Sequence, residues 1–352
     1  MSRSLLRRWP EWTGYAAAAW SLAYGILGIY WFAGGAGFPF GPAALDRRSG
    51  SMMEGVDAHV AGAAMAGIGL LGAATGVVMA RSGRRGRATT ALLGIGWSMA
   101  VLLTLIVQDY FLLGLIAFSP VLLVFAFTGV PGPQDGIGDI LYWHRTNLLV
   151  LFAGGLLWAA ATVAYRRRSR GACPHCGRMG GTHDDTSRET LHRWGRWAVL
   201  VAVLAPAPYE ITRVAWFLGF PLGVPRDFLR MMQQTPGMLG IGLGCAVASA
   251  LGTVLTHGLV HRWGERCPRW IWFRAGRRIP PALAVVPAAV VAAALIPAGL
   301  MNLRIPTRLD GWAINVPGML WTVWGAALGT AAYLYFLRRR AACRRCGNGG
   351  LR

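Results

Sequence analysis

Long apolar runs separated by clusters of arginine constrain this chain more than any other feature. Eight runs are close to 20 residues or longer, the length that a helix needs to cross about 30 Å of hydrocarbon. Of the 352 residues, 55% are hydrophobic and only 14% are charged, far fewer charges than a soluble domain carries. The sequence therefore predicts an all-α, polytopic membrane helix bundle of eight transmembrane helices. The predicted spans are residues 13–33, 57–80, 88–107, 146–165, 197–218, 237–260, 282–303 and 315–336.

A further apolar segment, residues 110–129, contains Pro120 and decides the topology. All 35 basic residues are arginine, and most lie in clusters between the predicted spans. If residues 110–129 do not cross, these clusters fall on one side of the membrane, as the positive-inside rule expects. We therefore expect residues 110–129 to be re-entrant or interfacial and both termini to be cytoplasmic. The clusters are residues 3–8, 81–87, 166–196, 262–278 and 338–352.

The net charge of +21 is explained by this topology. Arginine in cytoplasmic loops favours contact with anionic membrane lipid, so the charge does not indicate a nucleic-acid partner. The basic opening "MSRSLLRRWPEW" precedes a full-length span, and no small-residue cleavage site follows it. This pattern predicts an uncleaved anchor, not a signal peptide.

The two halves of the sequence resemble each other. "YGILGIYWFAGGAGFPFG" (24–41) matches "YEITRVAWFLGFPLG" (209–223) at Tyr, Ile, Trp and Phe, and then at Gly-Phe-Pro. "AYRRRSRGACPHCGR" (164–178) matches "YFLRRRAACRRCGN" (335–348) in the same way. These matches predict two parallel four-span repeats, residues 1–178 and 197–352, joined by a cytoplasmic linker at residues 179–196.

Each half closes on a Cys-x-x-Cys-Gly motif, formed by Cys173 and Cys176 in the first half and by Cys343 and Cys346 in the second. Two such motifs supply the four thiolates of a structural zinc site, and the glycine permits the tight turn beside the metal. Disulfides are disfavoured in the cytoplasm, where the topology places both motifs. We expect one structural zinc that joins the halves. Ordinary reduced thiols and a redox pair are the alternatives.

Three acidic residues lie in or beside apolar runs: Asp57, which is followed by His59, then Asp109 and Glu210. A charge at the centre of a bilayer costs about 2.5–3.5 kcal/mol on insertion scales, so such residues usually face a cavity or a partner. Arg213 shares a helical face with Glu210 and can pair with it. A structural ion pair and a functional site are both compatible with this spacing.

The alignment of the halves favours one asymmetric site. Glu210 and Arg213 are matched by Gly25 and Gly28 in the first half, whereas an architectural pair is expected in both halves. Asp109 likewise has no acidic match in the second half. We therefore expect Asp109 and Glu210 to open onto one lipid-shielded pocket between the halves.

Aromatic residues within the spans are the second functional signal. The chain has 16 tryptophans, and an interfacial belt accounts for many of them. Trp31, Trp216, Tyr24 and Tyr209 lie within spans instead, and aromatic faces stabilise cations, most strongly where water is excluded. These four residues are candidates to line a substrate pocket.

The sequence has no Walker loop, no dinucleotide-binding glycine pattern and no metalloprotease helix. The opening "GYAAAAWSLAYGILGIYWFAGGAGFPFG" resembles a large group of uncharacterised actinobacterial membrane proteins, in which the first span also ends in Tyr-Trp-x-x-Gly-Gly. That resemblance implies a bacterial cell membrane. More loosely, the architecture resembles the bacterial membrane-bound terpene cyclases that close indole sesquiterpenoids. This resemblance implies a carboxylic acid that protonates an olefin or an epoxide, with no cofactor.

The leading expectation is a membrane-embedded terpene cyclase or isomerase that acts by acid-initiated carbocation cyclisation of a prenylated lipophilic substrate. Arg213 would favour the ionised form of Glu210, which makes Asp109 the better proton donor. A small-molecule transporter or exporter and a non-catalytic zinc-stapled membrane protein are the alternatives. The candidate catalytic residues are Asp109, Glu210 and Asp57, and the candidate substrate-binding residues are Arg213, Trp31, Trp216, Tyr24, Tyr209 and His59.

Overall fold

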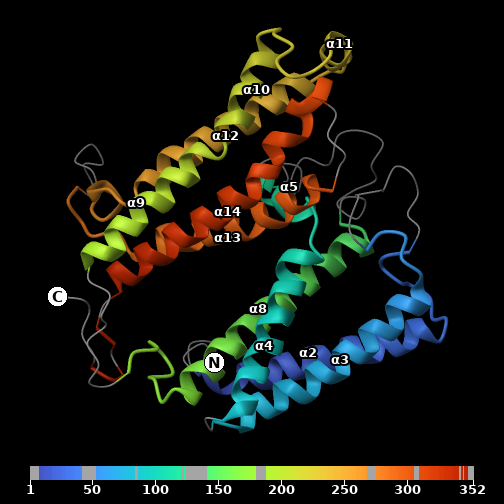
Figure 1. The fold of residues 1–352 in the computed structure, drawn as a ribbon, viewed down its shortest axis with the longest axis vertical. Helices are drawn as coiled ribbons and strands as arrows, with labels where there is room; N and C mark the ends of the chain where they lie inside the picture. Colours follow the sequence, from blue (N-terminus) through green and yellow to red (C-terminus); the bar gives the residue numbers. More distant parts are fainter. Residues whose placement is uncertain are drawn as a thin grey trace. The chain divides into compact units, whose positions relative to one another are not determined.

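The helices of this protein form two compact units (Figure 1), and each unit is described by itself. In the described part of the chain every regular element is helical, apart from an isolated β-bridge between Arg266 and Arg278. The predicted all-α class is therefore confirmed. The computed structural model describes residues 8–41, 53–83, 86–119, 123, 141–179, 188–267, 275–304, 309–340, 342–343 and 345–347.

Seven helical stretches among the described residues are long and apolar enough to cross a membrane. They coincide with seven of the eight predicted spans. The eighth prediction, residues 13–33, falls in helix α2 (Trp9–Phe32), which is long enough, but its tryptophans and tyrosines lower its mean hydropathy. The seven stretches are Ala58–Arg81, Ala88–Ile106, Trp143–Ser169, Glu189–Phe217, Met238–His257, Pro281–Asn302 and Leu309–Arg339.

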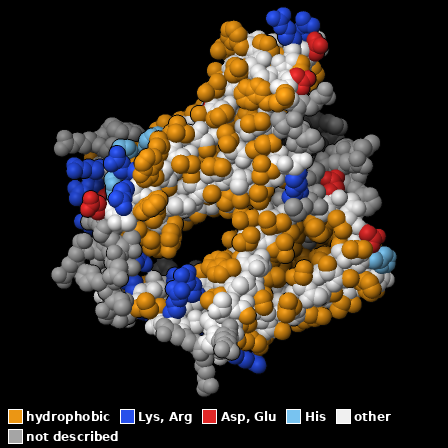
Figure 2. All heavy atoms as spheres, in the orientation of Figure 1, with side chains coloured by type: hydrophobic (Ala, Val, Ile, Leu, Met, Phe, Trp, Pro, Cys, Tyr) orange, Lys and Arg blue, Asp and Glu red, His pale blue; other side chains and the backbone are white. Residues whose placement is uncertain are grey.

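Many hydrophobic side chains lie on the face of these helices that Figure 2 shows. Side chains such as Leu71, Leu251 and Leu255 are about as exposed as surface residues of a soluble protein, at 58%, 61% and 67%. Exposure of so many large apolar side chains is unfavourable in water, and it suits helices that are surrounded by lipid. The predicted re-entrant segment 110–129 is described only in part. It contributes the short helix α5 (Phe111–Ala117), and residues 120–122 and 124–129 lie outside the described residues.

The first unit contains α2, α3 (Ala58–Arg81), α4 (Arg87–Val101), the π-helix η2 (Leu102–Ile106) and α8 (Trp143–Ser169). Glycines let α2 and α3 approach with their backbones in contact. A Cβ atom on Gly28 would lie 2.5 Å from the backbone nitrogen of Ala66, and one on Gly69 would lie 2.5 Å from that of Gly25. Small residues at such contacts are typical of helix pairs in membranes, where close packing drives association.

The second unit contains α5, α9 (Arg188–Leu204), α10 (Ala207–Phe217), α11 (Arg226–Gln234), α12 (Met238–His257), α13 (Pro281–Asn302) and α14 (Trp312–Arg339). The helical stretch 189–217 is broken at Ala205–Pro206, where Pro206 and Pro208 remove two backbone donors. The core lies between α9, α13 and α14 around Leu295, Leu328 and Tyr335.

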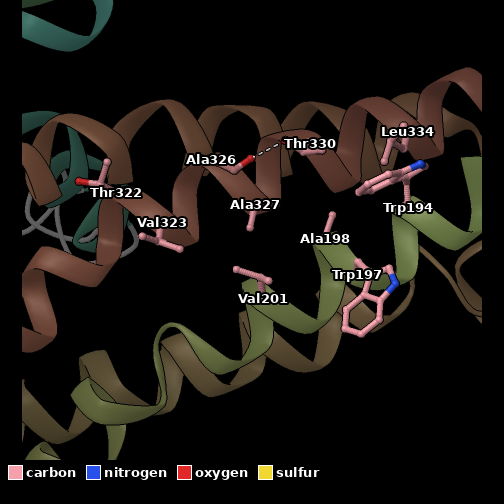
Figure 3. A pocket seen from close by; sticks show the side chains of 10 residues that line it. All are labelled: Trp194, Trp197, Ala198, Val201, Thr322, Val323, Ala326, Ala327, Thr330 and Leu334. Carbon is pink, nitrogen blue, oxygen red and sulfur yellow. Dashed lines mark hydrogen bonds between the residues drawn. The ribbon is translucent and has the colours of Figure 1, made fainter.

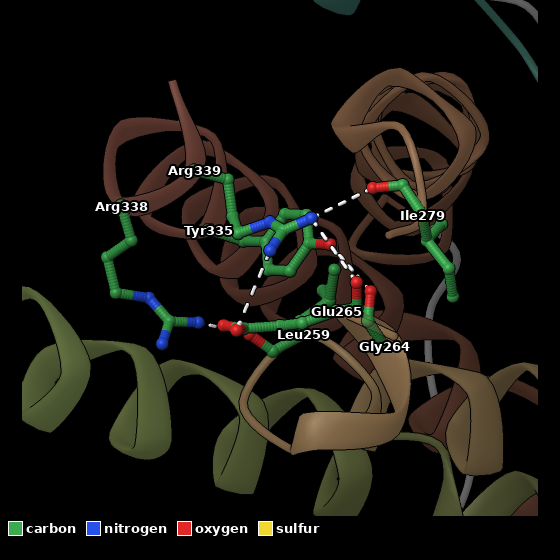
Figure 4. Close-up of polar contacts among 7 residues, drawn as sticks. All are labelled: Leu259, Gly264, Glu265, Ile279, Tyr335, Arg338 and Arg339. Carbon is green, nitrogen blue, oxygen red and sulfur yellow. Dashed lines mark hydrogen bonds and ion pairs between the residues drawn. The ribbon is translucent and has the colours of Figure 1, made fainter. Parts of the chain in front are cut away.

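Arginines at the end of α14 hold the loop that follows α12 (Figure 4). Arg338 donates a hydrogen bond to the carbonyl of Leu259, and Arg339 donates to that of Ile279 at 2.8 Å. Arg339 also forms an ion pair with Glu265, with 3.6 Å between the charged atoms, and the hydroxyl of Tyr335 donates to the carbonyl of Gly264. These arginines therefore stabilise a helix end and a loop besides contributing to the charge bias.

Aligned positions of the two sequence halves have similar local structures. Arg168 at the end of α8 donates to the carbonyl of Met79 at 2.7 Å, much as Arg338 donates to Leu259. At the ends of α2 and α10, Gly34 and Gly219 have positive φ angles of 87° and 88°. Glycine is favoured there because an L side chain is strained in this conformation.

Candidate metal centre and buried polar sites

Two cysteine motifs come together in the first unit, which includes residues 343–348. The motif after α8 turns tightly, because the N–H of Gly177 donates to the carbonyl of Cys173 at 2.8 Å. The motif after α14 has the same turn, with the N–H of Gly347 donating to Cys343 at 2.9 Å. Both glycines have positive φ angles, 74° and 69°, which explains the glycine that follows each Cys-x-x-Cys pair.

The four sulfur atoms form a cluster in which all ligand atoms lie within 4.8 Å of one another, and Cys176 Sγ lies 3.5 Å from Cys346 Sγ. Four thiolates around a tetrahedral zinc with Zn–S bonds of about 2.3 Å are about 3.8 Å apart. The shortest sulfur–sulfur distance, 3.5 Å, and the upper limit, 4.8 Å, lie on either side of this tetrahedral distance. Small side-chain rotations would therefore complete a tetrahedral site. All four cysteines are free thiols. The predicted juxtaposition of the two motifs is therefore confirmed, and the cluster could bind a metal such as zinc.

Backbone N–H groups favour the thiolate at one cysteine of this cluster, and burial opposes it at another. Arg167 donates to the carbonyls of Pro174 and His175 at 2.9 and 2.8 Å, which holds the first motif against α8. Backbone N–H groups of Cys346 and Arg345 lower the pKa of Cys343 to about 6, while burial raises the pKa of Cys176 to about 12. A divalent cation would displace the protons that remain, because it binds the thiolate form.

Asp109 is buried in the first unit, with 1% of its surface exposed. The helical stretch that leads to it changes from α-helix to π-helix at Leu102, ends at Ile106, and leaves Gln108 and Asp109 without helical backbone. Single π-helical turns in longer helices are frequent at functional sites. The side chain of Gln108 donates to the carbonyls of Leu103 and Leu148, at 2.8 and 3.1 Å, and so satisfies acceptors at the break.

The imidazole of His144 lies beside Asp109, with 3.8 Å between Nε2 and Oδ2. The Nδ1 atom of His144 lies 2.8 Å from the carbonyl oxygen of Pro39. A carbonyl oxygen only accepts hydrogen bonds, so Nδ1 carries a proton and Nε2 is the atom that faces the carboxyl group. A proton can reside on either partner, and the pair has no net charge in both states, which limits the cost of burying it.

A glycine-containing loop, residues 33–41, covers this pair. The indole of Trp143 donates to the carbonyl of Gly37 at 2.8 Å, and Phe40 is 2% exposed. The rings of Phe40 and Tyr142 lie 5.4 and 6.1 Å from that of His144. The pair is therefore surrounded by aromatic side chains and shielded from solvent.

Tyr24 and Trp31, two of the predicted substrate-binding residues, lie in the interior of the same unit. The hydroxyl of Tyr24 donates to Oδ1 of Asn147 at 2.7 Å, and its ring stacks on Trp20 with centroids 4.4 Å apart. Trp31 is 2% exposed and contacts Phe38 edge to face at 5.6 Å. Both residues contribute to the packing of the unit.

Asp57 and His59, also predicted to be site residues, lie at the start of α3. Asp57 caps the helix, because its carboxylate accepts hydrogen bonds from the backbone N–H groups of His59 and Val60, at 3.0 and 3.1 Å. The ring of His59 lies 2.7 Å from the carbonyl oxygen of Phe32, measured from Nδ1. These contacts give both residues a structural role, and the side chains are exposed.

Glu210 and Arg213 both lie on α10 in the second unit. Their charged atoms are more than 4.0 Å apart, so the two described residues do not form the ion pair that their spacing allows. Glu210 instead accepts a hydrogen bond of 2.7 Å from Ser249 on α12. The guanidinium of Arg213 lies over the rings of Tyr209 and Trp216, at 4.6 and 4.1 Å. Cation–π contact with two rings therefore replaces the ion pair.

Trp216 itself is 2% exposed, and its indole donates to the carbonyl of Leu222 at 2.9 Å.

Asp109 belongs to the first unit and Glu210 to the second, so each is described only with its own neighbours. The common pocket stays a prediction. The sequence did not predict a site role for His144, Gln108 or Ser249, because their contact partners are distant in the sequence. For His144 the one available signal was a histidine next to a tryptophan at the start of a span.

No protein-family model, curated protein or solved structure matches this chain. The resemblances drawn from its opening segment and its architecture therefore stay predictions. The seven apolar helices are consistent with a multi-pass membrane protein, and the cysteine cluster is a candidate metal centre within it.

Proposed function

We propose that this protein is a membrane-embedded enzyme that protonates a prenylated, lipophilic substrate and so starts its cyclisation, with Asp109 and His144 as the proton-transfer pair. The observation that carries the proposal is the burial of Asp109 beside an imidazole whose Nε2 faces it. A carboxyl group that is shielded from water is a strong proton donor to an olefin or an epoxide when it is protonated. Nearby aromatic rings stabilise the carbocation that results.

The reaction is an isomerisation, so protons balance without a cofactor. The carboxyl proton of Asp109 passes to the substrate, new carbon–carbon bonds form from the cation, and a proton lost from the product cation returns to the pair. His144 assists because its Nε2 can hold the proton between turnovers.

The test uses membranes that contain the full-length protein, incubated with prenyl-indole and epoxy-prenyl compounds and analysed for cyclised isomers. Removing a general acid typically lowers a rate about 10²- to 10⁴-fold, so Asp109→Asn and His144→Gln should each reduce the conversion by at least the lower value. Asp227→Asn is the matched control, because Asp227 is an exposed residue that pairs with Arg230. Conversion that is unchanged in both test variants would overturn the assignment.

Proton-coupled transport is the second candidate, and the helix break before Asp109 favours it. Broken helices with an acid at the break bind substrates and coupling ions in many transporters. Reconstituted vesicles with an imposed proton gradient separate the two candidates. Uptake that disappears in Asp109→Asn, without any cyclised product from the wild type, favours transport.

The remaining organisation is part of the same proposal. Eight spans form two parallel repeats of four, with both termini and both cysteine motifs in the cytoplasm of a bacterial cell, and a structural zinc binds Cys173, Cys176, Cys343 and Cys346. The similar helix ends at Gly34 and Gly219 support the repeat. If both activity assays are negative and zinc is present, the alternative is a membrane protein without catalytic activity in which zinc joins the two halves.

A further inference from the structure

An apolar groove of about 720 Å³ runs between α9 and α14 in the second unit (Figure 3). On α14 most of the lining side chains are alanine or threonine, or the slightly larger valine, which leaves the groove open. On α9 it is bounded by two tryptophans, Trp194 and Trp197, which are 59% and 60% exposed. The lining residues are Trp194, Trp197, Ala198, Val201, Thr322, Val323, Ala326, Ala327, Thr330 and Leu334.

The polar atoms of the groove do not face its interior. The hydroxyl of Thr330 donates to the carbonyl of Ala326 at 2.8 Å, and that of Thr322 is 3.5 Å from the carbonyl of Ile296. Both threonines therefore present methyl groups to the groove. In Figure 3 the indole nitrogens of Trp194 and Trp197 lie on the side of their rings away from Val201. A ligand in this groove is a hydrocarbon chain without hydrogen-bonding groups.

The length and position of the groove match one leaflet of a bilayer. It extends along α14 from Thr322 to Leu334, about 18 Å at 1.5 Å per residue. Half the hydrocarbon thickness of a membrane is about 15 Å. The tryptophans lie at the end of the groove next to the arginine-rich end of α14, where an interfacial belt places such side chains.

Positive charge lies at the same end. Arg193 and Arg196 are exposed and alternate with Trp194 and Trp197 in the first turns of α9. Arginine near a membrane surface attracts anionic headgroups with about 1 kcal/mol per residue, which is about a fivefold effect on affinity. The apolar groove and the adjacent cations therefore complement the two ends of an anionic phospholipid.

We propose that this groove binds one anionic phospholipid, with an acyl chain between α9 and α14 and the headgroup at Arg193 and Arg196. Tryptophan rings at the interface contact the first carbons of the chain. This lipid would be a resident ligand, independent of any substrate at Asp109.

Native mass spectrometry of the full-length protein in detergent tests the proposal, with phosphatidylglycerol and phosphatidylcholine of identical acyl chains as probes. We expect tighter binding of phosphatidylglycerol, and a loss of about fivefold in its affinity for each of Arg193→Gln and Arg196→Gln. Arg81→Gln is the matched control, because Arg81 is an exposed arginine at the end of another helix.

A second pair of variants tests the groove itself. Ala326→Phe fills it and should remove the bound phosphatidylglycerol, whereas Ala248→Phe, at an exposed alanine of α12, should not. Equal binding of both lipids would overturn the headgroup assignment. Retention of phosphatidylglycerol in Ala326→Phe would show that the lipid binds elsewhere and would overturn the proposal. A dimer that this variant dissociates would show that a second copy of the chain occupies the groove, and would overturn it too.

Discussion

Replacement of Cys346 by serine tests the candidate metal centre most directly. Cys346 is the exposed member of the cluster, and its sulfur lies 3.5 Å from that of Cys176. Serine has nearly the same size but supplies no thiolate, so the variant loses one of four ligands with little change in packing. We expect the wild type to purify with about one zinc per chain and Cys346→Ser to contain less than half of one.

The expected loss of stability follows from the position of the cluster in the sequence. A metal held by Cys176 and Cys346 closes a loop across a separation of 170 residues. The chain-entropy relation for cross-links gives about 5 kcal/mol at 25 °C for a loop of this length. This is an upper value, because insertion in a membrane already restricts the unfolded chain. A loss of that size lowers the Tm of a chain of 352 residues by about 7 °C, at an unfolding entropy of about 2.1 cal/mol/K per residue.

Two measurements on detergent-purified protein check this reasoning: zinc content by mass spectrometry and Tm by tryptophan fluorescence, each with and without a zinc chelator. The chelator should lower the Tm of the wild type and leave that of Cys346→Ser unchanged. Cys267→Ser is the control, because Cys267 is a free thiol outside the cluster. Wild-type protein with less than half a zinc per chain, or a variant as stable as the wild type, would refute the zinc assignment.

Three further substitutions test a helix–helix contact, an arginine hydrogen bond and a helix cap. The measurement for each is the free energy of unfolding in mixed micelles. Gly69→Val should lower the free energy of unfolding by at least about 1–3 kcal/mol, because the added Cβ meets the backbone of Gly25. Gly67→Val is the control and should be nearly neutral, because no atom lies within 4 Å of a Cβ at that position. Equal effects of the two variants would contradict the close α2–α3 contact. Arg338→Gln should cost about 1.5–3 kcal/mol through the lost charged hydrogen bond, and a neutral result would show that the loop after α12 is held otherwise. Asp57→Ala should cost about 0.5–2 kcal/mol as a lost cap, which a helix of unchanged stability would disprove.

The arginines illustrate how one residue type serves two purposes. Their clustering in the sequence predicts topology, and that prediction needs no knowledge of contacts. Arg168, Arg338 and Arg339 also donate to carbonyl groups at the ends of other helices or in loops. A guanidinium group carries five donors in a fixed planar arrangement, against three on a lysine ammonium, so it can donate to several such carbonyls at once.

The sequence by itself determined the helices that are long and apolar enough to cross a membrane, because that property depends only on the length and composition of a continuous segment. It also determined the two cysteine turns, since Cys-x-x-Cys-Gly is a local motif whose glycine sets the backbone. In both cases the deciding interactions lie within a few residues of one another.

Tertiary structure alone decided which groups meet. The repeated Cys-x-x-Cys-Gly motif predicted that the cysteines meet, but the packing of the chain decides how two motifs 170 residues apart place their sulfur atoms. His144 reaches Asp109 because α8 begins beside the break in another helix. Arg213 contacts two aromatic rings and does not pair with Glu210, because helical spacing fixes a shared face but leaves the choice of partner to rotamers and neighbours.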